Sequence, residues 1–465
     1  MAATPDPLPA VLLAVPAVIL ACRAGASLVR RFGQPAVIGE IATGILLGPS
    51  LLGWLWPASQ AWLFPSSVIP FTGMLGNIGL LAFMFLVGLE LDLGALRGHS
   101  RTAFGVSGAS IALPLALGVP LALGLYAGYA PDGVGRLPFV LFVAVSVSVT
   151  AFPVLARILT DRGMYATPTG ALAMACAAVD DVAAWCLLAV VVAVTTSSSA
   201  MGAVLTAALT VGFVVLMLKV VRPLLARIVA RATGVGSGAG SGSGSGSGSG
   251  HRDGILLAVL FSGLCLAALA TDRIGIHALF GAFLFGVVTP RGNPEVARSA
   301  GRLRAVTVPL LLPLFFVHTG LKTDLALLAA DPVQWLWAGA VLAVAVCGKW
   351  GGAALAARAT GRPWPQAMTL GALMNCRGLT ELVVLNIGLE LGVIGPKLFT
   401  MLVLMALVTT AITGPAVDRL ERRRRKVEFP QLTVVPDAQP EPQQGREQVR
   451  ERERAPQQVP QLTRT

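Results

Sequence analysis

Long apolar runs, separated by short polar stretches, follow one another along most of the chain. Each run approaches the roughly 20 residues that a helix needs to cross a bilayer. The pattern therefore predicts an all-α polytopic membrane protein with 13 transmembrane helices. The apolar segments cover, to within a few residues, 8–28, 36–55, 70–91, 103–128, 138–159, 168–195, 200–221, 254–271, 275–289, 305–321, 333–357, 364–389 and 396–417.

Composition supports this interpretation. Of the 465 residues, 55% are hydrophobic and only 12% are charged, whereas a soluble chain is about a quarter charged. These values exclude a soluble enzyme, a disordered regulator and a secreted disulfide scaffold. The net charge of +12 is typical of basic cytoplasmic loops, so no nucleic-acid partner is expected.

The basic residues predict the orientation in the membrane. Taken alternately, one set of loops carries most of the loop Lys and Arg, and the opposite set carries only a few. Because basic loops stay on the cytoplasmic side, we expect the N-terminus outside and the C-terminus inside the cell inner (plasma) membrane. An odd number of spans agrees with this orientation.

Two stretches are not predicted to be membrane helices. Residues 233–252 contain a Gly/Ser repeat that is typical of a flexible linker. Residues 421–465 begin with a basic run and continue polar, which predicts a disordered cytoplasmic tail that meets anionic membrane lipids. The remaining chain divides into 1–232, a first repeat plus a linker helix, and 253–420, a second repeat.

A short internal match indicates how the halves are related. Residues 83–93 and 315–325 share Phe, Gly, Leu, Asp and Leu at aligned positions. The first copy ends the third segment and the second copy ends the tenth. An odd number of crossings separates them, so the copies face opposite sides. We therefore expect two inverted six-helix repeats, the architecture of many secondary transporters.

Inverted repeats place their site where corresponding helices are broken. The fifth segment carries Ser148, Thr150 and Pro153, and the twelfth carries Asn375 and Gly378, all in mid-membrane. We expect crossed, discontinuous helices at these positions. Thr150 and Asn375 are candidate oxygen ligands for a hard cation, although plain hydrogen bonding within a helix remains an alternative.

Two adjacent acids, Asp180 and Asp181, lie inside an uninterrupted apolar span. Each costs ~2.5–3.5 kcal/mol to insert at the centre of a membrane helix. Such residues normally line a path for protons or ions. Because a helix turns ~100° per residue, the two carboxylates should point in different directions and have different partners.

Three more charged residues lie deep in apolar segments. Lys349 is available to pair with one of the aspartates, either as a purely structural ion pair or as a pair that responds to the cargo. Arg377 and Glu381 lie one turn apart on the same helix face. We expect them to pair and to support the unwound region.

The chain offers no signal for an enzyme or a resident cofactor. An intramembrane aspartyl protease needs two carboxylates that face each other, which adjacent helix positions do not provide. No Gly-Lys-Ser/Thr phosphate loop and no His/Cys cluster is evident in the sequence. The alternatives to a transporter of small cations are a gated cation channel and an exporter of an organic ion.

Five motifs give the chain a family resemblance. They cover residues 38–49, 85–90, 150–157, 178–185 and 375–388, and together they resemble the monovalent cation:proton antiporter-2 family. The resemblance implies a sodium/proton antiporter fold with a dimerisation domain and a mobile core, and a homodimer. It also implies exchange of Na+ or K+ for protons by alternating access.

The resemblance extends to individual residues. Asp181 matches the acid that carries the cation and the proton, and Asp180 matches its neighbour in members with two aspartates. Together the two aspartates are the expected metal ligands. Lys349 matches the lysine that pairs with Asp180. Thr150 and Asn375 fall on the crossed unwound helices.

Overall fold

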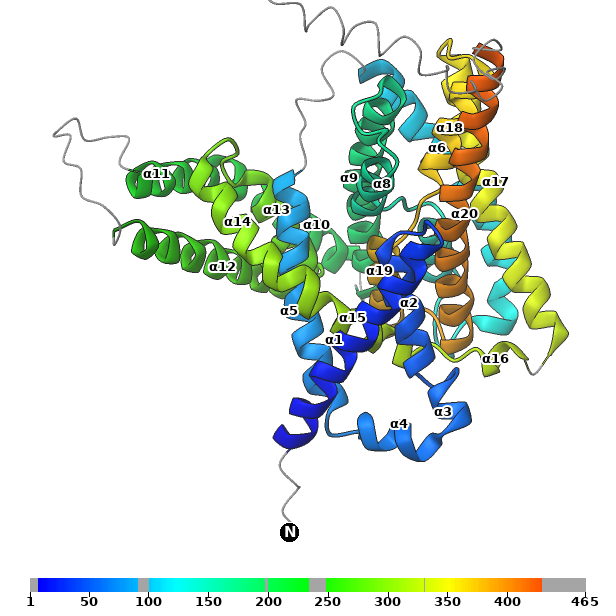
Figure 1. The fold of residues 1–465 in the computed structure, drawn as a ribbon, viewed down its shortest axis with the longest axis horizontal. Coiled ribbons are helices and arrows are strands. Elements are labelled where there is room, and N and C mark those ends of the chain that lie inside the picture. The colour runs from blue at the N-terminus through cyan, green and yellow to red at the C-terminus, as the bar shows by residue number, and fades with distance from the viewer. Residues whose placement is uncertain (1–6, 91–99, 197–199, 234–247, 330, 429–465) are drawn as a thin grey trace, which may run out of the picture. The chain divides into compact units, whose positions relative to one another are not determined.

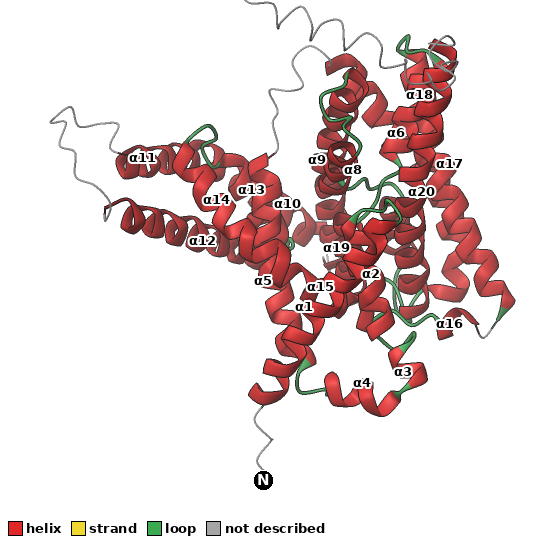
Figure 2. Cartoon of the chain, in the orientation of Figure 1, coloured by secondary structure: helices red, strands yellow, loops and turns green. Residues whose placement is uncertain are grey.

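The computed structural model describes residues 7–90, 100–196, 200–233, 248–329 and 331–428 (Figure 1). Within these ranges the regular structure is helical and no strand occurs (Figure 2). The first half contains α1 (Leu8–Arg31), α2 (Ala36–Leu47), α3 (Leu52–Leu55), α4 (Pro57–Leu63), α5 (Ile69–Glu90), α6 (Ser100–Tyr129), α7 (Arg136–Ser146), α8 (Phe152–Asp161), α9 (Pro168–Thr196), α10 (Ala200–Leu216) and α11 (Arg222–Thr233).

The second half contains α12 (Gly248–Ile274), α13 (Ala278–Val288), α14 (Pro294–Val306), α15 (Leu312–Leu321), α16 (Ala326–Ala329), α17 (Pro332–Ala359), α18 (Trp364–Met374), α19 (Leu379–Glu390) and α20 (Pro396–Glu428). Short π-helical turns join α10 to α11 and α14 to α15.

The membrane-spanning helices agree with the apolar pattern of the sequence. Among the described residues, 10 helices are long and apolar enough to cross a bilayer, and the α18–α19 pair, bent by 43°, makes 11. The shorter apolar helices α7 and α13 fall on the two remaining predicted segments. The all-α membrane fold is confirmed, and the count of 13 crossings stays a prediction.

Two predicted boundaries need correction. The linker was expected over 233–252, but α11 extends to Thr233 and α12 begins at Gly248; a formed helix gains a hydrogen bond with each added residue, even in a Gly/Ser sequence. The disordered tail was expected from 421, but α20 continues to Glu428, because Glu, Arg and Lys are good helix formers. Residues 234–247 and 429–465 lie outside the described residues. Contacts group the chain into Met1–Asp418 and Arg419–Thr465.

Helix packing in the first unit follows the two predicted repeats. α1 packs on α2 as α12 packs on α13, and α6 packs on α7 as α17 packs on α18. Across the repeats, α2 packs on α15 while α13 packs on α5, and α6 packs along α17. These four contacts of the first half therefore each have a counterpart in the second half.

The glycine shared by the two repeat motifs has the same role in both. A Cβ atom on Gly88 of α5 would lie 2.1 Å from the carbonyl oxygen of Phe283 on α13. A Cβ atom on Gly320 of α15 would lie 2.1 Å from the carbonyl carbon of Gly44 on α2. Only glycine allows these backbones to approach so closely, which explains why the motif keeps it in each copy.

The two broken helices cross where the sequence predicted. α7 ends at Ser146 and α8 begins at Phe152, while α18 ends at Met374 and α19 begins at Leu379. The Ala151 amide donates to the Cys376 carbonyl at 3.1 Å, which ties the two breaks together through the backbone. α9, which carries both aspartates, packs against α6, α7, α8 and α18, beside this crossing.

Candidate functional site

Asp180 is a buried carboxylate with every partner it needs. It accepts hydrogen bonds from the hydroxyls of Ser107, Ser110 and Thr150, with Ser110 at 3.0 Å and Thr150 at 2.7 Å. Lys349 completes the set with an ion pair of 2.9 Å. A carboxylate that is 1% exposed is stable as an anion only with such partners.

Lys349 is the matching buried cation, with a fully buried side chain. Besides Asp180, its ammonium donates to the carbonyl of Ser110 at 3.3 Å and to the carbonyl of Ser148. All three N–H groups of the ammonium are therefore used. The pair joins three elements distant in sequence, namely α9, α17 and the end of α7.

Asp181 differs sharply from its neighbour. It is fully buried, and neither carboxylate oxygen has a hydrogen-bond partner. The Thr380 side chain lies within interaction range of this carboxylate, but its hydroxyl completes no hydrogen bond either. Asp181 is thus the one of the two acids whose oxygens are free to take a proton or a cation.

Arg377 holds the broken end of α7. Its guanidinium donates to the carbonyl of Ser146 at 2.8 Å, to the carbonyl of Val147, and to Glu381 at 3.0 Å. The carbonyls at a helix C-terminus carry partial negative charge and have no partner within the helix. Arg377 and Lys349 together place two positive charges on these carbonyls.

Other polar groups of the break have no partner. Both side-chain atoms of Asn375 and the hydroxyl of Ser146 are buried without a hydrogen bond. Ser148, by contrast, donates its hydroxyl to the carbonyl of Val145 at 2.8 Å. Orphaned buried polar groups are uncommon, and they concentrate at functional sites.

These contacts decide several predictions made from the sequence. The Asp180–Lys349 pair and the Arg377–Glu381 pair are both present, and the adjacent aspartates have different partners, as predicted. Thr150 lies in the break between α7 and α8, and its hydroxyl is hydrogen-bonded to Asp180 and to the carbonyl of Met374. The roles of these residues in transport stay predictions.

Sequence reasoning missed Ser107 and Ser110, which complete the partners of Asp180. The available signal was two serines one turn apart in an apolar segment, which would face the same side of α6. Thr380 was also missed, because a lone threonine in a membrane helix normally bonds to its own backbone.

A polar network joins α15 to α19 at the end of the molecule where Glu390 lies. Lys322, just after α15, donates to Asn386 at 3.2 Å and pairs with Glu390 at 3.3 Å. Asn386 in turn donates to the Thr319 hydroxyl at 2.9 Å. These bonds connect α15, which packs on α2 and α5, to α19, which is one half of a broken helix.

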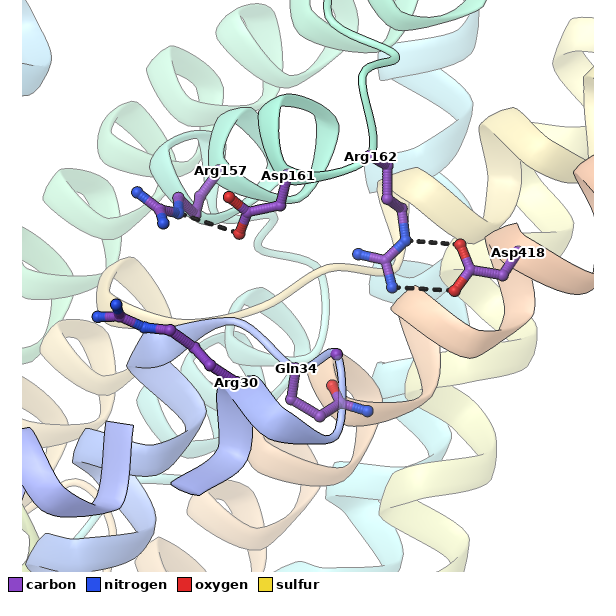
Figure 3. A pocket seen from close by; sticks show the side chains of 7 residues that line it. Arg30, Gln34, Arg157, Asp161, Arg162 and Asp418 are labelled. Atoms are coloured by element: carbon purple, nitrogen blue, oxygen red, sulfur yellow. Dashed lines mark hydrogen bonds and ion pairs between the residues drawn. The ribbon is translucent and has the colours of Figure 1, made fainter. Parts of the chain in front are cut away.

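A cavity of about 410 Å³ lies between the end of α1, the end of α8 and Asp418 of α20. Figure 3 shows the Arg157–Asp161 pair at 3.0 Å and the Arg162–Asp418 pair at 2.8 Å, with Arg30 across the space. Its lining residues are Arg30, Gly33, Gln34, Arg157, Asp161, Arg162 and Asp418. Among the described residues no cluster of three His, Cys, Asp or Glu could hold a resident metal ion.

Comparison with known proteins gives one consistent result. Residues 17–421 match the transmembrane sodium/hydrogen exchanger family. The chain is 41% identical over 391 residues to the Na+/H+ antiporter NhaS4 of Synechocystis, covering 84% of this chain and 92% of that protein. It is 40% identical over 412 residues to cation/H+ antiporter 20 of Arabidopsis thaliana, with 88% and 48% of the two chains covered.

More distant relatives extend the similarity. The K+/H+ antiporter 1 of Saccharomyces cerevisiae is 32% identical over 387 residues, with 82% of this chain and 43% of that protein covered. The chain thus spans about half the length of its plant and yeast relatives. The fold matches the sodium proton antiporter MjNhaP1 of Methanocaldococcus jannaschii with a TM-score of 0.57 at 13% identity, covering 89% and 99% of the chains.

Proposed function

Because the chain belongs to the sodium/hydrogen exchanger family, we propose that it exchanges a monovalent cation, Na+ or K+, for protons across the membrane. A secondary antiporter needs one group that binds either the cation or the proton, but not both at the same time. The proposal assigns this role to Asp181.

The observation that carries the proposal is the contrast between the two adjacent aspartates. The Asp180 carboxylate is saturated by three hydroxyls and by Lys349. The Asp181 carboxylate is equally buried and has no partner. A buried carboxylate without a partner is strongly unfavourable as an anion, so it takes either a proton or a cation.

Competition follows from charge. When Asp181 is protonated it is neutral and has no attraction for a cation. When the proton leaves, the carboxylate attracts a cation, and oxygen donors are the ligands that Na+ and K+ share with other hard cations. Binding of one cargo therefore expels the other, which couples the two fluxes.

The Asp180–Lys349 pair holds together the helices around Asp181, where the exchange is proposed to occur. It ties the interiors of α6, α9 and α17 to the break that follows α7. In the proposal the pair also responds to the cargo, because a cation on Asp181 repels the ammonium next door. A Lys349→Gln variant is expected to exchange without moving net charge, or not at all.

Alternating access requires one end of the site to be closed while the other is open. In the proposal, the network of Lys322, Asn386 and Glu390 serves as the closure at the end where α19 finishes, because it ties α15 to α19 there. On the orientation that the basic loops predict, this end faces outside, and the cavity around Arg162 faces the cytoplasm (Figure 3). The proposal thus describes a state closed to the outside.

The same proposal covers the cellular setting. The protein would lie in the plasma membrane with its N-terminus outside, in contact with anionic lipid on the cytoplasmic side, and would act as a homodimer. Its activity would need no cofactor beyond the transported ions.

The test uses purified full-length protein in liposomes that contain a pH-sensitive dye, with an imposed proton gradient. Addition of Na+ or K+ should dissipate the proton gradient across liposomes that contain the parent protein, and the cation that does so is the transported one. The signal should be lost in Asp181→Asn. Asp132→Asn, which makes the same change at an exposed turn, should retain it and serves as the matched control.

Two results would contradict the proposal. A folded parent protein that dissipates no gradient with either cation would point to an organic-ion cargo. Cation current that persists in Asp181→Asn without proton movement would point to a gated channel on the same fold.

A further inference from the structure

Thr380 is a buried threonine whose hydroxyl behaves unlike most others in the described helices. In Thr289, Thr409 and Thr413 the hydroxyl donates to a carbonyl one turn earlier in its own helix, at 2.7–2.9 Å. Thr380 is as deeply buried as these residues, at 1% exposure, yet its hydroxyl has no hydrogen-bond partner.

Helix geometry explains why Thr380 lacks the usual partner. It is the second residue of α19, which begins at Leu379. The carbonyl one turn earlier belongs to Cys376, which lies in the break before α19 instead of in a preceding turn of that helix, and it is turned toward the Ala151 amide of the other break. The unwinding of the twelfth segment therefore frees this hydroxyl from its own backbone.

The freed hydroxyl lies next to the one unpartnered carboxylate of the site. Thr380 is within interaction range of Asp181, and both carboxylate oxygens of Asp181 are without a hydrogen bond. The Asn375 amide, in the same break, is also buried without partners. The Asp181 carboxylate and the Thr380 hydroxyl thus offer oxygen atoms to a cation side by side, next to a break that holds a further unpartnered amide oxygen.

We infer that Thr380 binds the transported cation directly, together with Asp181, and sets the affinity of the site for it. The inference rests on the proposed function. A hydroxyl both donates and accepts, so it suits every state of this carboxylate. It donates to the empty anion, accepts from the protonated acid, and offers a lone pair to the cation.

The inference separates Thr380 from Thr150, the hydroxyl that the sequence favoured. The one proton of the Thr150 hydroxyl is shared between the Asp180 carboxylate at 2.7 Å and the Met374 carbonyl at 3.2 Å. Its hydroxyl is committed to the fixed pair and to the crossing. Thr380 has no such commitment and can rotate with the cargo.

The test compares three variants in proteoliposomes and in detergent. Thr380→Val keeps the shape and removes the hydroxyl, and should raise the half-saturating cation concentration roughly tenfold or more, because an interaction with a charged partner is lost. Thr380→Ser keeps the hydroxyl and should stay within about threefold of the parent. Thr289→Val, the matched control, makes the same change where the hydroxyl bonds only to its own helix and should leave the concentration unchanged.

A second measurement does not depend on transport. Stabilisation of the detergent-solubilised protein by added Na+ or K+ against heat should need higher cation concentrations in Thr380→Val than in Thr380→Ser. The ratio of Na+ to K+ affinity should also change in Thr380→Val, which a purely structural role would leave unmoved. If Thr380→Val does not fold, Thr380→Ala takes its place.

The outcomes distinguish this inference from the proposed function. If the parent protein exchanges cations and the parent and Thr380→Val have equal half-saturating concentrations and equal ion selectivity, Thr380 does not bind the cation. If the parent exchanges no cation, the proposed function itself fails. A tenfold loss in Thr289→Val as well would also overturn the inference, since the effect would then not be specific to the site.

Discussion

The buried pair of Asp180 and Lys349 allows a quantitative test of the site. Changing Lys349 to Met leaves the Asp180 carboxylate buried without a counter-charge. Removing one partner of a buried ion pair typically costs ~3–5 kcal/mol in the free energy of unfolding. The hydroxyls of Ser107, Ser110 and Thr150 still donate to the carboxylate, so we expect the lower end, about 3 kcal/mol.

The reverse change, Asp180→Asn, leaves the Lys349 ammonium with only the carbonyls of Ser110 and Ser148. The side chain is fully buried and cannot reach water, so a similar loss of about 3 kcal/mol is expected. Neither single variant retains a neutral core.

The double variant, Asp180→Asn with Lys349→Met, removes both charges and leaves no uncompensated ion. Its loss should be no larger than that of one single variant, because replacing a whole buried pair leaves no unpaired charge behind. The two changes should therefore be non-additive by about 3 kcal/mol or more, well above the ~0.5 kcal/mol seen for independent sites.

Unfolding by SDS in mixed micelles, followed by circular dichroism, gives the four free energies of this cycle. Lys397→Met makes the same chemical change at an exposed position and should have little effect. If the two single losses simply add in the double variant, the charges of Asp180 and Lys349 do not depend on each other. The account of the site given above would then be wrong.

Three further predictions concern stability and use the same measurement. Arg377→Lys should cost at least ~2 kcal/mol, because a lysine lacks the planar fork of donors with which Arg377 reaches the carbonyls of Ser146 and Val147 and the Glu381 carboxylate; an unchanged midpoint would contradict the capping role. Gly320→Ala should destabilise by ~1–3 kcal/mol or more through the clash with Gly44, whereas Gly339→Ala, with open space around it, should not destabilise. His277 accepts from the Leu279 amide at the start of α13, so His277→Ala should cost ~1 kcal/mol, whereas His277→Asn, which can still accept at this helix start, should retain most of that stability.

Much of this architecture could be predicted because the bilayer restricts the choices. A membrane leaves no alternative to helices of about 20 apolar residues, so each segment was visible without an alignment. The acids at 180 and 181 stood out because charge in such a segment is costly. The Arg377–Glu381 pair was predicted from a spacing of four residues on one helix; the pair is present, although Arg377 lies in the break before α19 and only Glu381 is helical.

The division of labour between the two aspartates could not be predicted from the residues alone. It depends on Ser107, which lies 73 residues from Asp180 in sequence, and on Lys349, which lies 169 residues away. Nothing local to the Asp-Asp pair indicates which carboxylate will be saturated. That information arises only when the fold brings Ser107 of α6 and Lys349 of α17 to Asp180 and leaves both oxygens of Asp181 without a hydrogen bond.

Thr380 shows a second limit of sequence reasoning. A threonine in an apolar segment is normally uninformative, because its hydroxyl bonds to the preceding turn. Whether that bond exists depends on where the helix starts, to within one residue. The sequence predicted a break near Gly378 but could not fix Leu379 as the first residue of α19.

The contrast between the two acids also explains how such a site would avoid leaking protons or ions. While the ion pair is intact, Asp180 and Lys349 cancel each other's charge, so the net charge of the core then depends on Asp181 alone. With a proton or a cation bound, Asp181 is neutral overall, and the core can rearrange without burying a bare charge. With neither bound, the carboxylate is an isolated buried anion, which costs several kcal/mol. On the proposed function, this penalty keeps the empty carrier from reorienting, and coupling follows from desolvation without any separate gate.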